Sequence, residues 1–313
     1  MDDVELMIGL INVVKRELGL ERLQATAELL SKESTLSSCL DRHLADDIPD
    51  SPGVYLFFGE NNLPLYIGKS INIRTRVMSH FSSDHASTKE MRIAQEIKHI
   101  EWIATAGDFG ALMLESRLVK ERQPIYNRQL HHERHLCAWR ISETADAQTL
   151  LILVHDNDIE PQHLGDLFGI YGTKIQVVEV LRNIVEKFSL CAKAVGLENG
   201  KGDCFGYQLK RCKGVCIGVE YKQLHYLRLQ QAMAAQRLTT WPHKGRIVIK
   251  EQNSAADQTD LHLFDHWCYL GTVSDEAELE DMLNTEAQLR FDLDTYKLLL
   301  QQLSNKQLEI IQL

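Results

Sequence analysis

Two short runs of β-forming residues joined by a polar turn constrain the fold of this chain most. Val54–Phe58 and Leu65–Gly68 are rich in β-branched and aromatic residues, and Glu60-Asn61-Asn62 between them is a turn sequence. Runs separated by so short a turn are expected to pair as a β-hairpin. Tyr55 and Tyr66 then stand on facing strands, eleven residues apart in the chain.

Helical and strand patterns follow the hairpin. Apolar spacing predicts helices over about 71–81 and 89–98, a third strand over His99–Thr105, and a further helix over Phe109–Arg122, with Leu112, Leu114, Leu118 and Val119 facing inward. Pro124 ends the last helix, because the residue before a proline disfavours helical geometry. The order is strand, strand, helix, helix, strand, helix, which predicts a small domain with a three-stranded antiparallel sheet that carries helices.

The rest of the chain has an α+β pattern in several segments. Residues 1–45 have helical apolar spacing, and Asp46–Pro52 is acidic, contains two prolines and is expected to be a linker. Two strands, Cys137–Ser142 and Leu150–His155, precede an amphipathic helix over Lys174–Phe188 and a cysteine-bearing segment. A helix over about 219–237 follows, and then strands alternate with helices; the strands are Arg246–Lys250 and His262–Val273, and the helices are 275–284 and 294–303. The predicted domains are residues 1–48 (helical N-terminal extension), 49–135 (mixed domain), 136–218 (strands, helix and four-cysteine segment) and 219–313 (C-terminal α/β module).

The negative net charge of the chain argues against non-specific electrostatic binding to the phosphates of a nucleic acid. The net charge is −10; residues 1–49 hold 5 basic and 10 acidic side chains, and residues 50–134 hold 11 and 10. A role on nucleic acid must therefore rest on a specific site. No apolar run approaches the roughly 18 residues that cross a bilayer. The acidic start, Met1–Glu5, lacks the positive charge of a secretory signal, so a cytoplasmic location is expected.

Six side chains of the 49–135 domain are candidates for chemistry. Taken singly, each has an ordinary structural explanation, since tyrosines in strands usually pack and a glutamate among leucines can be an exposed neighbour. Phenol, carboxylate, guanidinium and ammonium groups in one small domain nevertheless supply the proton acceptors and positive charge that phosphate chemistry needs. The six are Tyr55, Tyr66, Lys69, Arg76, Glu115 and Asn127.

Together these residues follow the order and spacing of a known nuclease signature. The pattern resembles the GIY-YIG nucleases, and within them the N-terminal nuclease of UvrC, the bacterial excision-repair incision protein, and even more its shorter homologues of the Cho type. The resemblance covers about residues 49–313. It departs at His80, where many UvrC nucleases have a tyrosine; an imidazole there can still support the site. The matching elements are Gly53-Val54-Tyr55, Tyr66-Ile67-Gly68-Lys69, Arg76, Leu114-Glu115 and Pro124-Ile125-Tyr126-Asn127.

The resemblance implies a metal-dependent phosphodiester hydrolase. Glu115 would hold one Mg²⁺ or Mn²⁺, and Arg76 would offer a bidentate fork to the scissile phosphate. One of the two tyrosines would be the general base, with its pKa lowered from about 10 by roughly two to three units through Lys69 and metal-bound solvent. Asn127 would orient a neighbouring group by hydrogen bonding.

The cysteines indicate a metal centre. Four of the seven cysteines fall within 26 residues, and in a reducing compartment disulfides are improbable. Four thiolates match either tetrahedral zinc or an iron–sulfur cluster. The resemblance implies a 4Fe–4S cluster, with Zn²⁺ as the alternative. Lys210, Arg211 and Lys213 lie between the cysteines and are either a solvated face or contacts to DNA phosphates. The four predicted ligands are Cys191, Cys204, Cys212 and Cys216.

Three other patterns receive no chemical role. Gly169-Ile170-Tyr171 matches the motif name literally, but no hairpin partner or Tyr-Ile-Gly follows it. Adjacent histidines in His131–His135 point apart on most backbones, so a polar loop is expected there. Asp294 is expected to cap the last helix.

The resemblance implies an enzyme that nicks damaged double-stranded DNA once, on the 3′ side of the lesion, after UvrA and UvrB have located it. Full-length UvrC carries a second nuclease, and the 97 residues after Cys216 are too few for that domain and its tail. Two alternatives remain at this point. One is another GIY-YIG nuclease of the homing, restriction or junction-resolving type, and the other is a non-enzymatic DNA-binding scaffold with an inactive nuclease fold.

Overall fold

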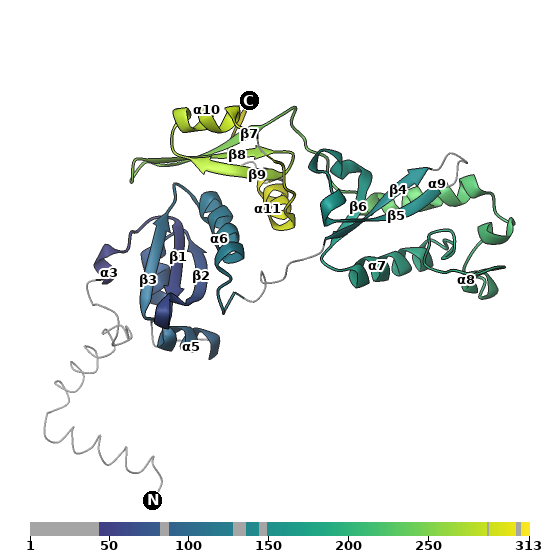
Figure 1. The fold of residues 1–313 in the computed structure, drawn as a ribbon, viewed down its shortest axis with the longest axis horizontal. Helices are drawn as coiled ribbons and strands as arrows, with labels where there is room; N and C mark the ends of the chain where they lie inside the picture. Colours follow the sequence, from purple (N-terminus) through teal and green to yellow (C-terminus); the bar gives the residue numbers. More distant parts are fainter. Residues whose placement is uncertain (1–43, 82–87, 128–135, 144–148, 287, 305–307) are drawn as a thin grey trace, which may run out of the picture. The chain divides into compact units, whose positions relative to one another are not determined.

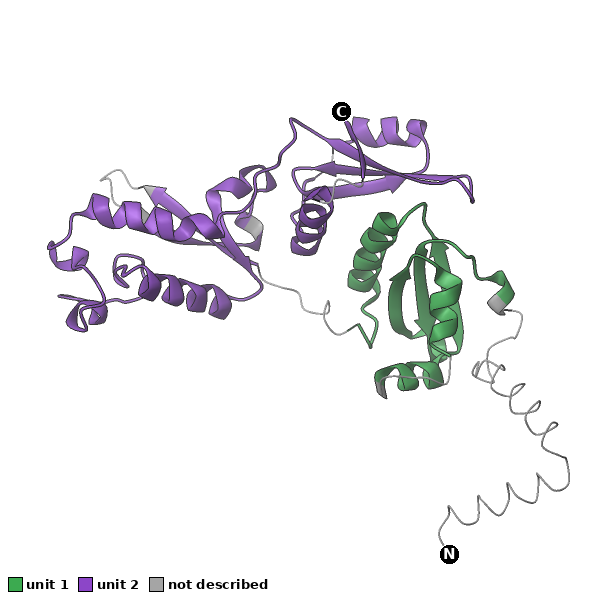
Figure 2. Cartoon of the chain, turned by 180° about the vertical axis from the view of Figure 1, so that it is seen from behind, with its two compact units in different colours: residues 1–131 green, residues 132–313 purple. Residues whose placement is uncertain are grey.

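The computed structural model describes residues 44–81, 88–127, 136–143, 149–286, 288–304 and 308–313. The chain divides into two compact units, residues 1–131 and 132–313 (Figure 2). The helices predicted over residues 1–45 and the polar loop at His131–His135 lie outside the described residues, apart from the short helix α3, Leu44–Asp47. None of the described helices has both the length and the apolar character that crossing a membrane requires.

The first unit contains the predicted three-stranded sheet. Its order is β2-β1-β3, and both pairings are antiparallel, so the hairpin and the order of elements are confirmed (Figure 1). A 3₁₀ turn, η1, joins the two hairpin strands. The elements of this unit are β1 Gly53–Phe58, η1 Glu60–Asn62, β2 Pro64–Ser70, α4 Ile73–Ser79, α5 Thr88–Glu96, β3 His99–Ala104 and α6 Asp108–Arg122.

Strand β1 is the centre of this unit because helices cover both of its faces. All six of its residues are buried. Side chains alternate along a strand, so Tyr55 and Phe57 pack with α4 and α5, whereas Val54 and Leu56 pack with α6. Each large apolar side chain buried in this way contributes about 1.5–3 kcal/mol. The central strand therefore holds the hairpin rigidly from both sides.

Helix α6 faces the sheet with a different set of residues from the one predicted. Leu118 and Val119 are buried as expected. Leu112 and Leu114 are only half-buried, and the deeper positions belong to Ala111 and neighbouring residues. The face is displaced because small residues let the helix approach the strands closely. The buried positions of the helix are Phe109, Gly110, Ala111, Met113, Leu118 and Val119.

The segment predicted as a linker is folded onto the first unit instead. Ile48 is 1% exposed and belongs to the same core as Tyr55. Arg74 Nε donates a hydrogen bond of 2.7 Å to the carbonyl of Ile48, and Arg74 Nη1 lies 3.1 Å from a carboxylate oxygen of Asp50. Proline and acidic residues predicted a linker, but one apolar side chain and one arginine are enough to fix this segment.

The second unit contains two antiparallel sheets, with orders β5-β4-β6 and β10-β7-β8-β9. The strands predicted near 137–142 and 150–155 and the helix predicted over 174–188 are confirmed. Strand β6 was not predicted; it contains Gly169-Ile170-Tyr171 and pairs with β4, so this tripeptide belongs to a different sheet from the β1-β2 hairpin. The elements of this part are β4 Cys137–Glu143, β5 Thr149–His155, η2 Asp156–Asp158, η3 Pro161–Asp166, β6 Leu167–Tyr171, α7 Lys174–Lys187, α8 Phe205–Gln208, η4 Val215–Ile217, α9 Lys222–Met233 and η5 Ala234–Gln236.

The C-terminal sheet differs from the prediction in three places. The strand predicted over 262–273 is two strands, because His266 and Trp267 take left-handed φ angles of 44° and 67° and form a tight turn. An edge strand, β10, was not predicted. The last helix is capped by Asp292, whose Oδ1 accepts from the backbone N–H of Thr295 at 2.8 Å, and not by Asp294. The elements are β7 Ile247–Asn253, β8 Gln258–Asp265, β9 Cys268–Val273, α10 Glu276–Asn284, α11 Leu293–Ser304 and β10 Glu309–Gln312.

Candidate active site

Three ring side chains meet on the face of the β2-β1-β3 sheet that α4 covers. The centroids of Tyr55 and Tyr66 lie 6.1 Å apart, and His80, at the end of α4, lies 5.5 Å from Tyr55 and 6.0 Å from Tyr66. Tyr55 Oη and His80 Nε2 form a buried hydrogen bond of 3.0 Å. The two predicted tyrosines and the histidine therefore form one group.

Gly68 is required by this arrangement. A Cβ atom at this position would lie 2.4 Å from Tyr55 Oη and 2.9 Å from Tyr66 Cε1. Both distances are shorter than any ordinary carbon contact, so a larger residue must displace the phenols. The glycine of the Tyr-Ile-Gly element thus keeps space for the ring of Tyr55 over β2.

Burial and neighbouring negative charge raise the pKa of both phenols. Burial is the largest cause for Tyr55, and Tyr66 adds to it, while Arg76 acts in the opposite direction. For Tyr66 burial is again the largest cause, the charge of Glu115 adds to the rise in pKa, and Arg76 opposes it. This differs from the lowered pKa that a tyrosine base needs, and Lys69 does not supply the correction. A further positive charge, such as that of a bound divalent cation, would act against this rise in pKa.

Glu115 and Lys69 are held together by helix α6. The backbone N–H of Lys69 donates to Glu115 Oε1 at 3.2 Å. The ammonium of Lys69 lies 2.7 Å from each carboxylate oxygen of Asp108, a residue that the sequence-based prediction missed. Asp108 and Glu115 are seven residues apart, which is two helical turns, so they share one face of α6. Lys69 is therefore fixed at its backbone and at its side chain by the same helix.

The environment of Glu115 suits a bound cation. Burial raises the pKa of its carboxyl, the backbone N–H of Lys69 lowers that pKa, and the charge of Asp108 raises it again. In the described part of the chain, no hydrogen bond reaches the second oxygen, Oε2. A half-buried carboxylate whose second oxygen accepts no hydrogen bond can coordinate Mg²⁺ or Mn²⁺. These ions bind one or two protein carboxylates and complete their coordination shell with water.

Asn127 and Arg76 occupy different positions relative to the strands. Asn127 Oδ1 accepts from the backbone N–H of Ile67 at 2.9 Å, and its Nδ2 donates to the carbonyl of Ile67 at 2.7 Å. This side chain thus fixes β2 between Tyr66 and Gly68. Arg76 is exposed on α4, close enough to both phenols to affect their pKa. An exposed guanidinium at this place can meet a phosphate group.

Lys89 is a second residue that the sequence did not single out. Its Nζ lies over the ring of Tyr66, 5.2 Å from the centroid. It comes from α5, which lies beside the hairpin, and nothing in its sequence context distinguishes it from an ordinary surface lysine. The contact adds positive charge on the solvent side of Tyr66.

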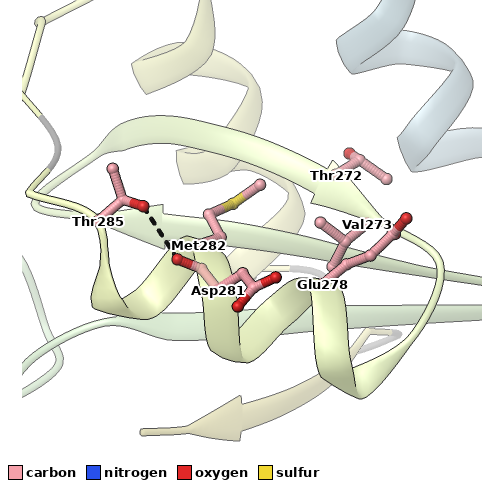
Figure 3. Close-up of a pocket in the computed structure, with 6 residues that line it drawn as sticks. All are labelled: Thr272, Val273, Glu278, Asp281, Met282 and Thr285. Carbon is pink, nitrogen blue, oxygen red and sulfur yellow. Dashed lines mark hydrogen bonds between the residues drawn. The ribbon is translucent and has the colours of Figure 1, made fainter.

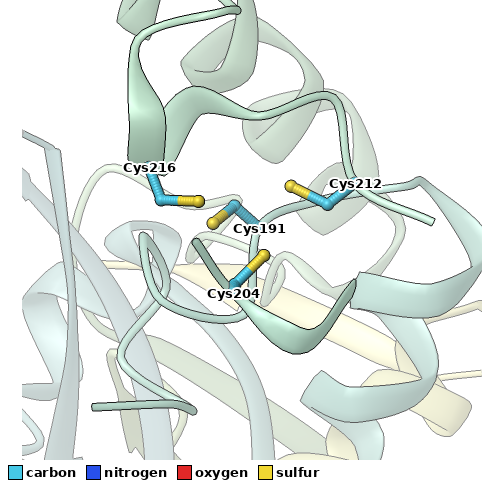
Figure 4. A group of neighbouring side chains, drawn as sticks. All are labelled: Cys191, Cys204, Cys212 and Cys216. Carbon is cyan, nitrogen blue, oxygen red and sulfur yellow. The ribbon is translucent and has the colours of Figure 1, made fainter. Parts of the chain in front are cut away.

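The four predicted cysteine ligands meet in the second unit and form a cage (Figure 4). Their sulfur atoms all lie within 4.8 Å of one another. The backbone N–H of Gly214 donates to Cys212 Sγ at 3.3 Å, and that of Cys191 donates to His225 Nε2 at 3.0 Å. Burial raises the pKa of Cys191 and of Cys212, whereas hydrogen bonds from Tyr207 N–H and from the other cysteines lower the pKa of Cys204. The donor set and its amide contacts fit a metal centre.

The basic residues between the cysteines are not equivalent. Arg211 Nη1 lies 3.0 Å from Glu186 Oε1 on helix α7. Lys210 and Lys213 are exposed. In the described residues neither of these two lysines forms an ion pair. Of the three basic residues predicted as possible phosphate contacts, Lys210 and Lys213 are therefore the two whose side chains are unpaired in the described part of the chain.

An open hollow of about 530 Å³ lies on the C-terminal sheet and α10 (Figure 3). Its polar groups stabilise the helix: Glu278 accepts from the backbone N–H of Ser274 at 3.0 Å, and Thr285 Oγ1 donates to the carbonyl of Asp281 at 3.0 Å. Because these groups are occupied locally, the hollow receives no chemical role. It is lined by Thr272, Val273, Glu278, Asp281, Met282 and Thr285.

Three protein-family models match consecutive parts of the chain. The UvrC-like GIY-YIG domain matches residues 51–128 and therefore contains the ring group and Glu115. The middle domain of the UvrC/Cho excinucleases matches residues 136–235, with the cysteine cage. The C-terminal domain of excinuclease Cho matches residues 246–313.

Curated relatives show the same similarity over most of the chain. Excinuclease cho of Salmonella typhimurium is 39% identical over 276 residues, 87% of this chain and 89% of that protein. The Escherichia coli protein of that name is 37% identical with the same coverage. The UvrABC system protein C of Caldicellulosiruptor saccharolyticus is 30% identical over 183 residues, 57% of this chain and 30% of that protein. A solved structure, the magnesium-bound GIY-YIG endonuclease domain of UvrC from Thermotoga maritima, is 31% identical, covers 28% of this chain and 99% of its own, and has a TM-score of 0.25.

Proposed function

The chain belongs to the excinuclease Cho family of UvrC-like GIY-YIG endonucleases, and from this premise we propose that it makes one nick on the 3′ side of a lesion in DNA. Membership of this family sets aside the homing, restriction and junction-resolving alternatives, and the inactive scaffold. One of the three matched domains is a nuclease domain, which supports a single incision.

The observation that carries the proposal is the grouping of two phenols, an imidazole and a half-buried carboxylate on one hairpin and its flanking helices. Of the two phenols, Tyr55 is 1% exposed and hydrogen-bonded to His80, whereas Tyr66 is half-buried. Tyr66 is therefore the phenol that water and substrate can reach. We assign it as the base that takes the proton from the attacking water.

The other side chains position the reacting groups. The rings of Tyr55 and His80 pack against the ring of Tyr66. Asn127 fixes the backbone next to Tyr66 through its hydrogen bond with the N–H of Ile67. Arg76 reaches the scissile phosphate from the exposed face of α4. Glu115 would hold a divalent cation, which, when bound, supplies positive charge for the transition state and lowers the pKa of nearby proton donors. This positive charge would counteract the raised pKa values of the two phenols.

We further propose that the substrate is damaged double-stranded DNA, delivered through UvrB after recognition by UvrA. The name of one relative associates that protein with a UvrABC system, and the net charge of −10 favours delivery by a partner over direct binding. The test is a duplex with one defined lesion, incubated with the purified chain with and without UvrA, UvrB and Mg²⁺. One nick, 3′ of the lesion and dependent on all three additions, is expected. Nicks on the 5′ side or on undamaged DNA would contradict the proposal.

The cysteine cage is proposed to hold a 4Fe–4S cluster, as the family resemblance implies. Zinc is the alternative that the sulfur spacing favours. A tetrahedral zinc ion with Zn–S bonds of about 2.3 Å holds its thiolate sulfurs about 3.8 Å apart. The sulfurs of the cage lie within 4.8 Å of one another, which is closer to this zinc spacing than to the wider sulfur spacing around a four-iron cluster. A cluster therefore requires the cysteine loops to open outward when it binds.

A further inference from the structure

Residues 204–219, which carry three of the four cysteines and are called the cysteine knuckle below, have an unusual charge for this protein. Three basic residues and no acidic residue lie in this stretch, although the whole chain has a net charge of −10. A local excess of positive charge on an acidic chain favours a negatively charged partner at this surface.

The backbone of the knuckle folds into hydrogen-bonded loops. The backbone N–H of Arg211 donates to the carbonyl of Gly206 at 2.7 Å, and that of Val219 donates to the carbonyl of Gly214 at 3.0 Å. Gly214 has a φ of 83°, and a Cβ atom there would lie 2.8 Å from the ring of Tyr207. The two loops thus pack against each other around the sulfur atoms.

Large apolar side chains on the knuckle point into solvent. Phe205 is 63% exposed and Val219 is 65% exposed; Leu209 and Ile217 are 47% and 41% exposed. Phe205 directly follows Cys204, and Ile217 directly follows Cys216. The sulfur atoms of these two cysteines lie within 4.8 Å of each other. Four exposed apolar side chains within one short stretch make this stretch a candidate contact surface.

We propose that the cysteine knuckle contacts the DNA substrate, with Lys210 and Lys213 on phosphates and Phe205 against an unpaired base. Aromatic side chains beside lysines suit unpaired nucleic acid, because the ring stacks on a base and the lysines pair with the backbone. Arg211 is not assigned to a phosphate, because in this structure its guanidinium pairs with Glu186. The inference rests on the DNA substrate of the proposed function and extends it to the second unit.

The charge arm of the test uses two lysine variants and a matched pair. Lys210 has a left-handed φ of 59°, which asparagine tolerates, so the variant is Lys210→Asn with Lys213→Gln. The control, Lys244→Gln with Lys297→Gln, removes the same charge from exposed lysines of the C-terminal part. Binding of a labelled duplex with a short unpaired bubble is measured in EDTA at about 50–200 mM salt. The knuckle variant should lose affinity and about two units of salt slope, and the control neither.

The stacking arm uses Phe205→Ala, with Ile175→Ala, which removes an 80% exposed side chain from α7, as its control. Phe205→Ala should weaken binding to the bubble about five- to a hundredfold and leave binding to a fully paired duplex unchanged. Metal content and unfolding temperature should match the wild type in all four variants, because only surface groups change.

Two outcomes overturn the inference. An unchanged salt slope and bubble affinity would show that the knuckle does not touch DNA. Unchanged DNA binding with lost binding to purified UvrB would assign the surface to a protein partner instead. Both readouts are binding measurements without Mg²⁺, so they are independent of where, or whether, the enzyme cuts.

Discussion

The phenol of Tyr55 and the imidazole of His80 form a hydrogen bond of 3.0 Å inside the nuclease domain. Both residues are almost completely buried, and the ring of Tyr66 stands beside them on the same face of the sheet. A histidine at this position therefore takes the place of the tyrosine expected from the family resemblance as a hydrogen-bonding partner of Tyr55. We propose that its role is to position the phenols.

Removal of this partner should cost both stability and rate. His80→Phe keeps a ring in the core but leaves the hydroxyl of Tyr55 without this partner, so the free energy of unfolding should fall by about 1–3 kcal/mol. Nicking should slow as Tyr66 loses its support. Tyr55→Phe removes the same bond from the other side. The double variant should therefore be less destabilised than the sum of the two, measured by chemical denaturation. Strict additivity would show that the bond contributes nothing.

Glu115→Gln should abolish nicking. The amide keeps the shape of the side chain and can still accept from Lys69, but it removes the charge that would hold the cation. We expect a fall in single-turnover rate of at least about 10²–10³-fold, with unfolding and DNA binding unchanged. Glu121→Gln, on the exposed face of the same helix, is the control. A Glu115→Gln enzyme with wild-type rates in Mg²⁺ would remove the metal assignment.

The Mg²⁺ requirement should depend on pH through Glu115. Burial raises the pKa of this carboxyl, and only the ionised form binds a cation. As pH falls through the raised pKa, protons compete with the metal, so more Mg²⁺ is needed for half-maximal rate. Asp108→Asn removes one cause of the raised pKa and should move this dependence to lower pH. Asp50→Asn, which breaks a similar pair with Arg74, should not. Either change should cost less than about 1 kcal/mol of stability, because both pairs are partly exposed.

The sequence predicted the hairpin and the positions of the site residues because these follow from local patterns. Short runs of β-branched and aromatic residues on either side of a polar turn define β1 and β2, and the hairpin then places Tyr55 near Tyr66. The salt bridge between Lys69 and Asp108 could not be predicted in this way, since it depends on how α6 lies against β2. The same holds for Ile48, whose burial depends on the surface left open by α4. The turn at His266 and Trp267 was missed because neither residue usually takes a left-handed conformation.

The cysteine cage should contain metal when the protein is purified without oxygen. A 4Fe–4S cluster gives broad absorbance near about 400 nm from thiolate-to-iron charge transfer. Cys204→Ser should lower the bound metal and the absorbance together, whereas Cys268→Ala, a buried cysteine outside the cage, should not. Stoichiometric zinc without iron would favour the alternative and keep the four ligands. A protein with neither metal would end the assignment.

Binding to undamaged duplex should be weak at about 150 mM salt, because phosphate contacts supply most non-specific affinity. The basic side chains near the two sites offer fewer contacts than their number implies. Arg74 is held by Ile48 and Asp50, and Arg211 by Glu186, so neither is available to phosphate without breaking those interactions. The net charge of −10 should weaken binding to bare DNA further, which would protect intact duplex from stray nicks if, as we propose, a bound partner delivers the enzyme. Titration of a labelled duplex over a range of salt concentrations should give a shallow slope and low affinity. Tight binding, together with efficient lesion-specific nicking in the absence of UvrB, would show that the enzyme finds its own target.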